Sequence, residues 1–139
     1  ADVEALIAGI QDGTIDCLST DHAPHTPADK AAGMAGISNI EHAFQIYLKV
    51  FQENGIPLTR LSEMLSLNPA KRLGLKAGLF LPGYAASVTA LSVEEESEID
   101  AMRMISRSHN TPFHGRKVMG RVLKTIIDGE TKYEYNAAI

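Results

Sequence analysis

Three side chains that could carry acid–base or metal chemistry lie within five residues of one another. Asp21, His22 and His25 follow residues 15–20, a short apolar and partly β-branched run that we expect to form a buried strand. A carboxylate at the end of such a strand can bind a metal ion and accept a proton from a metal-bound water. A nearby imidazole can hold an anionic group of a substrate, and Pro24 would direct His25 into a cleft.

A structural role would explain the same residues. Asp and His are common in turns and caps after a strand, and a His-x-x-His spacing is by itself more often structural than metal-binding. A catalytic zinc site needs about three protein ligands and an open position. The other histidines, His42, His109 and His114, form no second pair with ligand spacing. The pattern therefore predicts an incomplete metal site and leaves both interpretations open.

Periodicity predicts the elements that surround these residues. Apolar spacing indicates a helix from a cap at Asp2 to a stop at Gly13, and residues 20–37 have the composition of a long loop. A second helix is expected to begin at a capping box of Ser38 and Glu41 and to end at Asn54-Gly55. Shorter helices are expected after a cap at Thr59 and from Asn68-Pro69 to Gly74.

The second part of the chain has the pattern of a β structure. We expect strands over residues 86–93 and 118–127, and a hairpin at Asp128-Gly129 that leads into residues 131–135. Glu94–Glu96 is expected to be a solvated loop between the strands. The sequence thus predicts an α/β part followed by a β part, with a boundary near residues 75–80.

Composition limits the classes of protein that the chain can represent. Its 139 residues are too few for a complete (β/α)8 barrel, which needs roughly 200 to 250 residues. A net charge of −4 with scattered basic residues argues against nucleic-acid binding, and the lack of an 18-residue apolar run argues against a membrane location. The single cysteine, Cys17, cannot form an intrachain disulfide, which favours a reducing cytoplasm.

A family resemblance adds to this reading of the residues. Residues 12–25, above all the run Asp-His-Ala-Pro-His over Asp21–His25, resemble the late barrel strand of dihydroorotases, members of the metal-dependent amidohydrolase superfamily. Hydantoinases and allantoinases share the Asp-His pair and typically lack the Ala-Pro-His continuation. The resemblance continues through residues 32–36, Glu41, residues 68–71, 74–75, Gly78, residues 82–83, 110–113 and 127–129. It implies the C-terminal part of a (β/α)8 TIM barrel over residues 1–76, followed by strands of a small β-sandwich over residues 77–139.

The resemblance also implies an activity and a set of site residues. A dihydroorotase interconverts N-carbamoyl-L-aspartate and (S)-dihydroorotate in de novo pyrimidine biosynthesis, with one or two zinc ions. By this resemblance Asp21 would be the general acid/base and a zinc ligand, and His25 would hold the substrate carboxylate. The backbone at Ala32 and Gly33 would approach the substrate, and His22 is expected to make a structural hydrogen bond.

The count of metal ligands predicts that this chain does not act alone. One carboxylate cannot fix a zinc centre, so the remaining ligands must come from an N-terminal part of the enzyme, and the chain by itself should be inactive. Two alternatives remain: a non-catalytic scaffold that binds aspartate transcarbamoylase, and a hydantoinase-type enzyme that acts on a different ring. Retention of both Asp21 and His25 argues against the scaffold. A second copy of the same protein, forming a homodimer, is the other partner that the resemblance allows.

Overall fold

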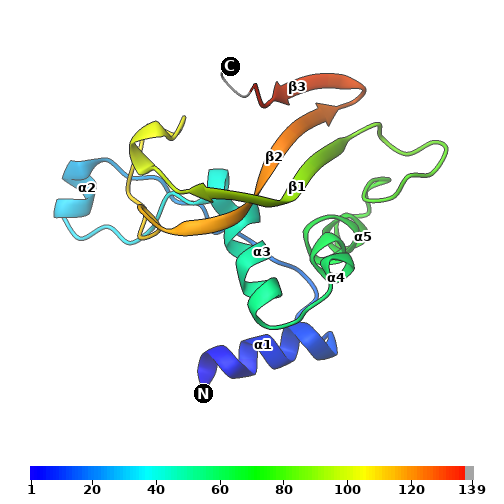
Figure 1. The fold of residues 1–139 in the computed structure, drawn as a ribbon, viewed down its shortest axis with the longest axis horizontal. Helices are drawn as coiled ribbons and strands as arrows, with labels where there is room; N and C mark the ends of the chain where they lie inside the picture. Colours follow the sequence, from blue (N-terminus) through cyan, green and yellow to red (C-terminus); the bar gives the residue numbers. More distant parts are fainter. Residues whose placement is uncertain (137–139) are drawn as a thin grey trace. The chain divides into compact units, whose positions relative to one another are not determined.

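A computed structural model describes residues 1–136, which form a mixed α/β structure (Figure 1). The elements in chain order are α1 (Asp2–Asp12), α2 (Pro27–Ala31), η1 (Ile40–His42), α3 (Ala43–Glu53), α4 (Leu58–Ser62), η2 (Glu63–Leu67), α5 (Asn68–Arg72), β1 (Val88–Glu98), η3 (Ala101–Arg103), β2 (Lys117–Ile127) and β3 (Glu130–Glu134). The chain divides into two compact units. Unit 1 contains residues 1–19, residues 50–92 and the described residues from Val122 onward, and unit 2 contains residues 20–49 and 93–121.

The first helix confirms the predicted extent and corrects the predicted cap. Helix α1 ends before Gly13, whose φ of 90° is the left-handed conformation that glycine adopts at helix ends. Asp2 is the first helical residue, and Ala1 takes the N-cap position with no side-chain cap among the described residues. The carboxylate of Asp2 still lies in the first turn, where the helix dipole favours negative charge.

Residues 15–20 do not form the predicted strand. A strand exists only where a neighbouring strand accepts and donates the ladder hydrogen bonds. In the described part of unit 1, the carbonyls of Ile15 and Asp16 and the N–H of Leu18 bind a helical run instead. The N–H of Leu18 donates to the carbonyl of Met64 at 3.2 Å. The prediction failed because it was made from the apolar run alone, without knowledge of a pairing partner.

The helix around residues 40–53 begins differently from the prediction. A 3-10 turn, η1, leads directly into α3, and the expected capping box is absent from the described structure. Glu41 instead accepts hydrogen bonds from the backbone N–H groups of Ile105 and Ser106, and the buried hydroxyl of Ser38 has no partner among the described residues. The spacing of Ser38 and Glu41 fits a capping box, but the Glu41 carboxylate bonds to residues distant in sequence instead.

The predicted short helices form one continuous helical run, α4–η2–α5. Its N-cap is Pro57 rather than Thr59, and its middle turn, η2, is a π-helix. The turn lies just before Pro69, which has no N–H to donate and whose ring would clash with the carbonyl four residues earlier in an α-helix. The wider π turn accommodates this proline without ending the helix.

The three strands form one sheet in the order β1-β2-β3. Strands β2 and β3 form the predicted antiparallel hairpin, and its turn contains Asp128 at φ 51° and Gly129 at φ 81° (Figure 1). Glu94–Glu96 lies within β1, which corrects the predicted loop. There Glu95 makes an ion pair of 2.6 Å with Arg121 of β2, so the acidic run is a strand with cross-strand partners.

Each unit has its own group of buried apolar side chains. In unit 1 this group comprises Ile10, Phe51, Ile56, Leu61, Met64 and Ala70, and in unit 2 it comprises Leu48, Ile99, Ala101, Met104 and Val118. Burial of this kind is the main favourable contribution to folding. None of the helices in residues 1–136 has the length and apolarity needed to span a membrane.

Candidate active site

Asp21 is an exposed aspartate in a strained backbone conformation. Its φ of 44° lies in the left-handed region, which a residue other than glycine rarely adopts. Holding such a residue there costs about 1 kcal/mol, and residues of this kind gather at functional sites. Asp21 is therefore a carboxylate that solvent or a ligand can reach.

The next residue, His22, makes the structural hydrogen bonds that we expected. Its Nδ1 accepts hydrogen bonds from the backbone N–H groups of Asn39, at 3.1 Å, and Ile40, at 3.3 Å. An accepting Nδ1 requires the tautomer that carries its proton on Nε2. Asn39 also donates from its side chain to the carbonyl of Thr20, at 2.8 Å. His22 and Asn39 thus tie the residues around Asp21 to the start of η1.

His25 lies against the backbone of Gly36. A Cβ added at Gly36 would come within 2.8 Å of both the Cβ and the carbonyl oxygen of Ala23, and within 3.1 Å of Cδ2 of His25. Gly36 also has a φ of 127°, so a side chain is excluded both by space and by conformation. The N–H of Ala23 donates to the carbonyl of Ile37 at 3.0 Å, and His22 and Ile37 form a parallel bridge. The loop from residue 26 to residue 36 therefore returns to pack beside the segment that carries Asp21 and His25.

A short helix that we did not predict, α2, begins this loop. Thr26 caps it: the Thr26 Oγ1 accepts from the N–H of Asp29 at 3.1 Å, and the Asp29 carboxylate accepts from the N–H of Thr26 at 3.0 Å. The Asp29 carboxylate also accepts from the Thr26 hydroxyl at 2.7 Å, and this bond, together with the one from the Thr26 N–H, holds the pKa of Asp29 below its usual value. The signal was present as a threonine, a proline at the first helical position and an acidic residue two positions later.

The end of the loop is held by the ammonium group of Lys30. Lys30 donates from Nζ to the carbonyls of Met34, at 2.6 Å, and Gly36, at 3.0 Å. Ala32 and Gly33 lie between Lys30 and Met34 in the chain and are exposed. Gly33 has a φ of 88°, and a Cβ there would meet no atom within 4 Å among the described residues. The backbone conformation thus requires glycine at position 33, and the contact of Ala32 and Gly33 with a substrate stays a prediction.

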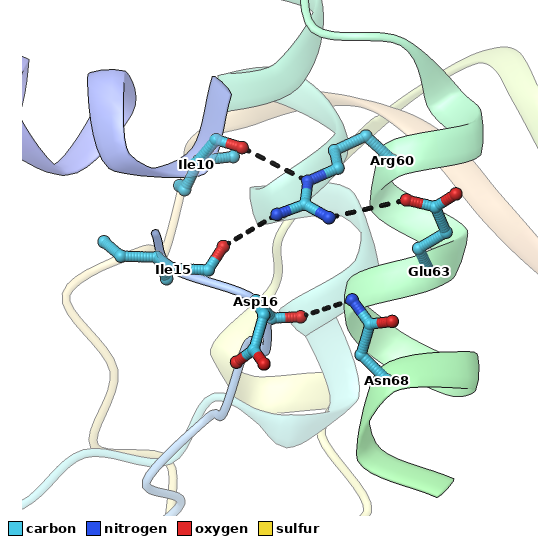
Figure 2. Close-up of polar contacts among 6 residues, drawn as sticks. All are labelled: Ile10, Ile15, Asp16, Arg60, Glu63 and Asn68. Atoms are coloured by element: carbon cyan, nitrogen blue, oxygen red, sulfur yellow. Dashed lines mark hydrogen bonds and ion pairs between the residues drawn. The ribbon is translucent and has the colours of Figure 1, made fainter. Parts of the chain in front are cut away.

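In unit 1, the residues that precede Asp21 in the chain are bonded to the helical run α4–η2–α5 (Figure 2). Arg60 donates from its guanidinium to the carbonyls of Ile10, at 3.2 Å, and Ile15, at 2.9 Å. Asn68 donates from Nδ2 to the carbonyl of Asp16 at 2.8 Å. Figure 2 shows these donors pointing from the helical run toward the carbonyl of Ile10, in α1, and those of Ile15 and Asp16 in the extended segment. Side chains thus satisfy backbone groups that a sheet neighbour would otherwise satisfy.

Two titratable groups in the same segment do not have the character of reactive groups. The Arg72 guanidinium, 2.6 Å from the Asp16 carboxylate, holds the pKa of Asp16 below its usual value. Burial, together with the neighbouring charge of Asp16, raises the pKa of the Cys17 thiol. A thiol with a raised pKa is a poor nucleophile and a poor metal ligand. Asp16 and Cys17 therefore have structural roles.

The described residues do not assemble a complete metal centre. Among residues 1–136, no group of three or more His, Cys, Asp or Glu side chains is arranged to hold a metal ion. An exposed carboxylate such as that of Asp21 is a suitable oxygen donor for a divalent metal. Asp21 therefore fits one ligand position, whereas a complete zinc centre does not fit the described residues.

Comparison with known proteins decides the family. Residues 1–132 match the sequence pattern of the Amidohydrolase family. The chain belongs to the amidohydrolase family. This confirms the resemblance found in the Asp-His-Ala-Pro-His run.

Curated relatives of this amidohydrolase chain carry the name dihydroorotase. The chain is 40% identical over 134 residues to the dihydroorotase of Clostridium botulinum, covering 96% of this chain and 34% of the relative. It is 43% identical over 138 residues to the dihydroorotase of Lactiplantibacillus plantarum, covering 95% of this chain and 32% of the relative. The chain thus spans about a third of the length of the curated relatives it matches.

Solved structures of related enzymes have the same fold over nearly all of this chain. An L-hydantoinase from Arthrobacter aurescens superposes with a TM-score of 0.86 at 26% identity, over 96% of this chain and 32% of that protein. A D-hydantoinase from Thermus sp. superposes with a TM-score of 0.86 at 20% identity, over 94% of this chain and 31% of that protein. At 20% identity, the likeness to the Thermus enzyme is evidence about the fold alone.

Proposed function

We propose that this amidohydrolase chain supplies the acid–base carboxylate of a zinc-dependent dihydroorotase. The reaction is the reversible interconversion of N-carbamoyl-L-aspartate and (S)-dihydroorotate in de novo pyrimidine biosynthesis. The observation that carries the proposal is the division of roles within Asp21–His25: His22 is occupied by backbone N–H groups, whereas Asp21 is exposed at a left-handed bend. The dihydroorotase relatives, at about 40% identity, support the same reaction.

Asp21 is the residue proposed to move the proton. In ring opening, its carboxylate accepts a proton from the water that attacks the ring carbonyl carbon, as the new C–O bond forms. It then returns this proton to the ring nitrogen as the C–N bond breaks, and in ring closure the two transfers run in reverse. A zinc ion, when bound, supplies polarisation of the carbonyl and a more acidic water, with Asp21 as one of its ligands.

The substrate carboxylate is proposed to bind at the loop that follows. His25 would hold it, and the exposed backbone of Ala32 and Gly33 would approach the substrate from the same loop. The loop is suited to this because Lys30 and Gly36 hold its two ends together, which reduces the entropy lost when an anion binds.

The larger architecture is also a proposal. Residues 1–76 would be the last helix and strand units of a (β/α)8 TIM barrel, and residues 77–139 would be strands of a small β-sandwich. In that setting residues 15–20 would gain neighbouring strands, and Asp21 would lie at the carboxyl end of a barrel strand, where barrel enzymes have their active sites. We place the enzyme in the cytoplasm.

The ring on which the enzyme acts separates the two candidate functions, dihydroorotase and hydantoinase. The whole protein should open (S)-dihydroorotate at least about a hundredfold faster, in kcat/KM, than it opens hydantoin, since a site built for a substrate carboxylate loses that contact with hydantoin. The hydantoinase-type alternative is favoured by the hydantoinase fold neighbours and predicts the opposite ratio. Activity on neither ring, together with binding of aspartate transcarbamoylase, would identify the scaffold instead.

A further inference from the structure

Asn110 bonds to the substrate loop through both its side chain and its backbone. Its Nδ2 donates to the carbonyl of Gly36 at 2.8 Å, and its own carbonyl accepts from the N–H of Ser38 at 2.7 Å. Ser38 is fully buried. The bond to Ser38 therefore lies where competition with water is weak, and the bond to Gly36 joins two half-buried residues.

Residues 36–38 are consequently held on two sides. The carbonyl of Gly36 and the N–H of Ser38 point to Asn110, and the carbonyl of Ile37 points the other way, to the N–H of Ala23. This alternation is that of an extended strand between two neighbours. Residues 36–38 therefore lie between Asn110 and residues 22–25 and are hydrogen-bonded to both.

The contact at Gly36 links this arrangement to His25. Gly36 lies so close to Ala23 and His25 that a single added carbon atom would come within 3.1 Å of Cδ2 of the imidazole. Outward movement of the Gly36 peptide would remove the surface against which the imidazole rests. The position of His25 thus depends on the bond from Asn110.

The segment that precedes Asn110 is bonded to Glu41. The Glu41 carboxylate accepts from the N–H groups of Ile105, at 2.9 Å, and Ser106, at 2.8 Å. Only a side chain with a hydrogen-bond donor can bond the Gly36 carbonyl, so aspartate, which has the same shape and only acceptors when ionised, cannot replace asparagine.

We propose that Asn110 is a positioning residue that sets the place of His25 and, through it, the binding of the substrate carboxylate. This inference rests on the proposed function for its catalytic consequence. Its structural half, the dependence of His25 on Asn110, does not. A purely structural anchor would affect the stability of the whole unit and would leave no specific signature at His25 or in KM.

The test uses Asn110→Asp and Asn110→Ala in the whole protein, with Asn54→Ala as the control. Asn54 also makes one side-chain hydrogen bond to a backbone carbonyl, that of Val50 at 2.8 Å, and it belongs to unit 1. We expect both Asn110 variants to raise KM for N-carbamoyl-L-aspartate about tenfold with kcat within about twofold, because binding of the carboxylate is weakened and proton transfer is not. The control should leave KM unchanged.

Two measurements are independent of catalysis. Hydrogen exchange at the N–H groups of Ala23 and Ser38 should become about tenfold faster in the Asn110 variants, and the NMR signal of the His25 ring should shift, with neither change in Asn54→Ala. If exchange and the His25 signal respond while the wild-type protein opens no dihydroorotate, the positioning by Asn110 stands and the proposed function fails.

Other outcomes overturn the inference. Unchanged exchange and an unchanged His25 signal in both variants would show that Asn110 does not position the imidazole. A fall in kcat equal to the rise in KM, or failure of both variants to fold, would assign Asn110 to general stability. If only Asn110→Ala fails to fold, Asn110→Asp, which keeps the volume of the side chain, decides the question.

Discussion

Asp21 and Asp128 share a backbone conformation for different reasons. Both are aspartates with positive φ, 44° and 51°. Asp128 is followed by Gly129, also left-handed, in the tight hairpin turn that requires this geometry, and its N–H donates to Ser87 Oγ at 3.2 Å. Asp21 is in no hairpin turn. Its strain therefore points to function, in the direction from an observed outlier to a role.

Asp21 and Asp128 together provide a matched test of the proposed acid–base residue. We expect Asp21→Asn to lower kcat of the whole protein by about 10²- to 10⁴-fold, because the amide cannot accept the proton. Asparagine adopts the left-handed region as readily as aspartate, so the free energy of unfolding should hardly change. Asp128→Asn makes the same chemical change at the same φ and should leave kcat unchanged. An Asp21→Asn variant with near-normal turnover would contradict the assignment.

The ion pair between Asp16 and Arg72 predicts a dependence of stability on pH. Arg72 lowers the pKa of Asp16 in the folded protein below its unfolded value, for which 3.8 is the usual figure. The unfolded state then binds more protons between the two pKa values, so this contribution is present above pH 3.8 and is lost as the pH falls through the folded pKa.

Replacing Arg72 isolates this contribution. In Arg72→Gln, the urea midpoint should fall less between pH 6 and pH 3 than it does in the wild type. The pKa values of Asp12 and Asp29 are also lowered, by hydrogen bonds to Thr14 and Thr26, and give the same acid dependence in both proteins. Identical acid dependence of the two proteins would show that the pair does not stabilise the fold.

At the scale of elements, the helical run α4–η2–α5 takes the place of a sheet neighbour for residues 15–18. Arg60 and Asn68 donate to the carbonyls of Ile15 and Asp16, and the carbonyl of Met64 accepts from Leu18. All of these donors and acceptors belong to unit 1. The order of the extended segment therefore depends on side chains of the helical run.

Loss of the Asn68 side chain should release this segment. Asn68→Ala leaves the carbonyl of Asp16 without its side-chain donor, and we expect the free energy of unfolding in urea to fall by about 1 kcal/mol. Hydrogen exchange at the Leu18 N–H should accelerate at the same time. Asn54→Ala removes a bond of similar length at the end of α3 and should leave the Leu18 exchange rate unchanged. Equal acceleration in both variants would refute the specific role of Asn68.

What could be predicted from the sequence differs between kinds of element. Helix α1 and the β2–β3 hairpin were predictable because local signals define them: apolar spacing with Gly13 in one, Asp128-Gly129 in the other. The strand over residues 15–20 was not, because a strand depends on a neighbour that local sequence does not reveal. The capping box at Ser38 failed similarly, since Glu41 bonds to residues more than sixty positions away.

At the scale of the whole molecule, the candidate site was predictable in part. The run Asp21–His25 identified the family, and the family assignment covers residues 1–132. The metal centre could not be derived, because residues 1–136 bring no three His, Cys, Asp or Glu side chains together to hold a metal ion. The role of Asn110 was also beyond sequence analysis, since its partner Gly36 is 74 positions away.

The ligand count gives a prediction for the chain by itself. We expect purified residues 1–139 to show no dihydroorotase activity with zinc present. Addition of a polypeptide that carries the N-terminal part of a dihydroorotase should restore activity, and a version of that polypeptide without its metal-binding histidines serves as the control. Turnover by the 139 residues alone, above the background rate of an Asp21→Asn variant purified in the same way, would refute the ligand count.

The π turn at Glu63–Leu67 has a consequence for how this chain can tolerate length changes. A π turn holds one residue more than the α turn it replaces, and each α-helical residue rotates the chain by about 100°. Deleting one residue from this turn would therefore leave an α turn of nearly the same rotation, and Asn68 would still face the Asp16 carbonyl. Deleting one residue from α4, where every turn is α-helical, would instead rotate Asn68 by about 100°. A change of one residue in length should therefore be tolerated at the π turn and not in the turn before it.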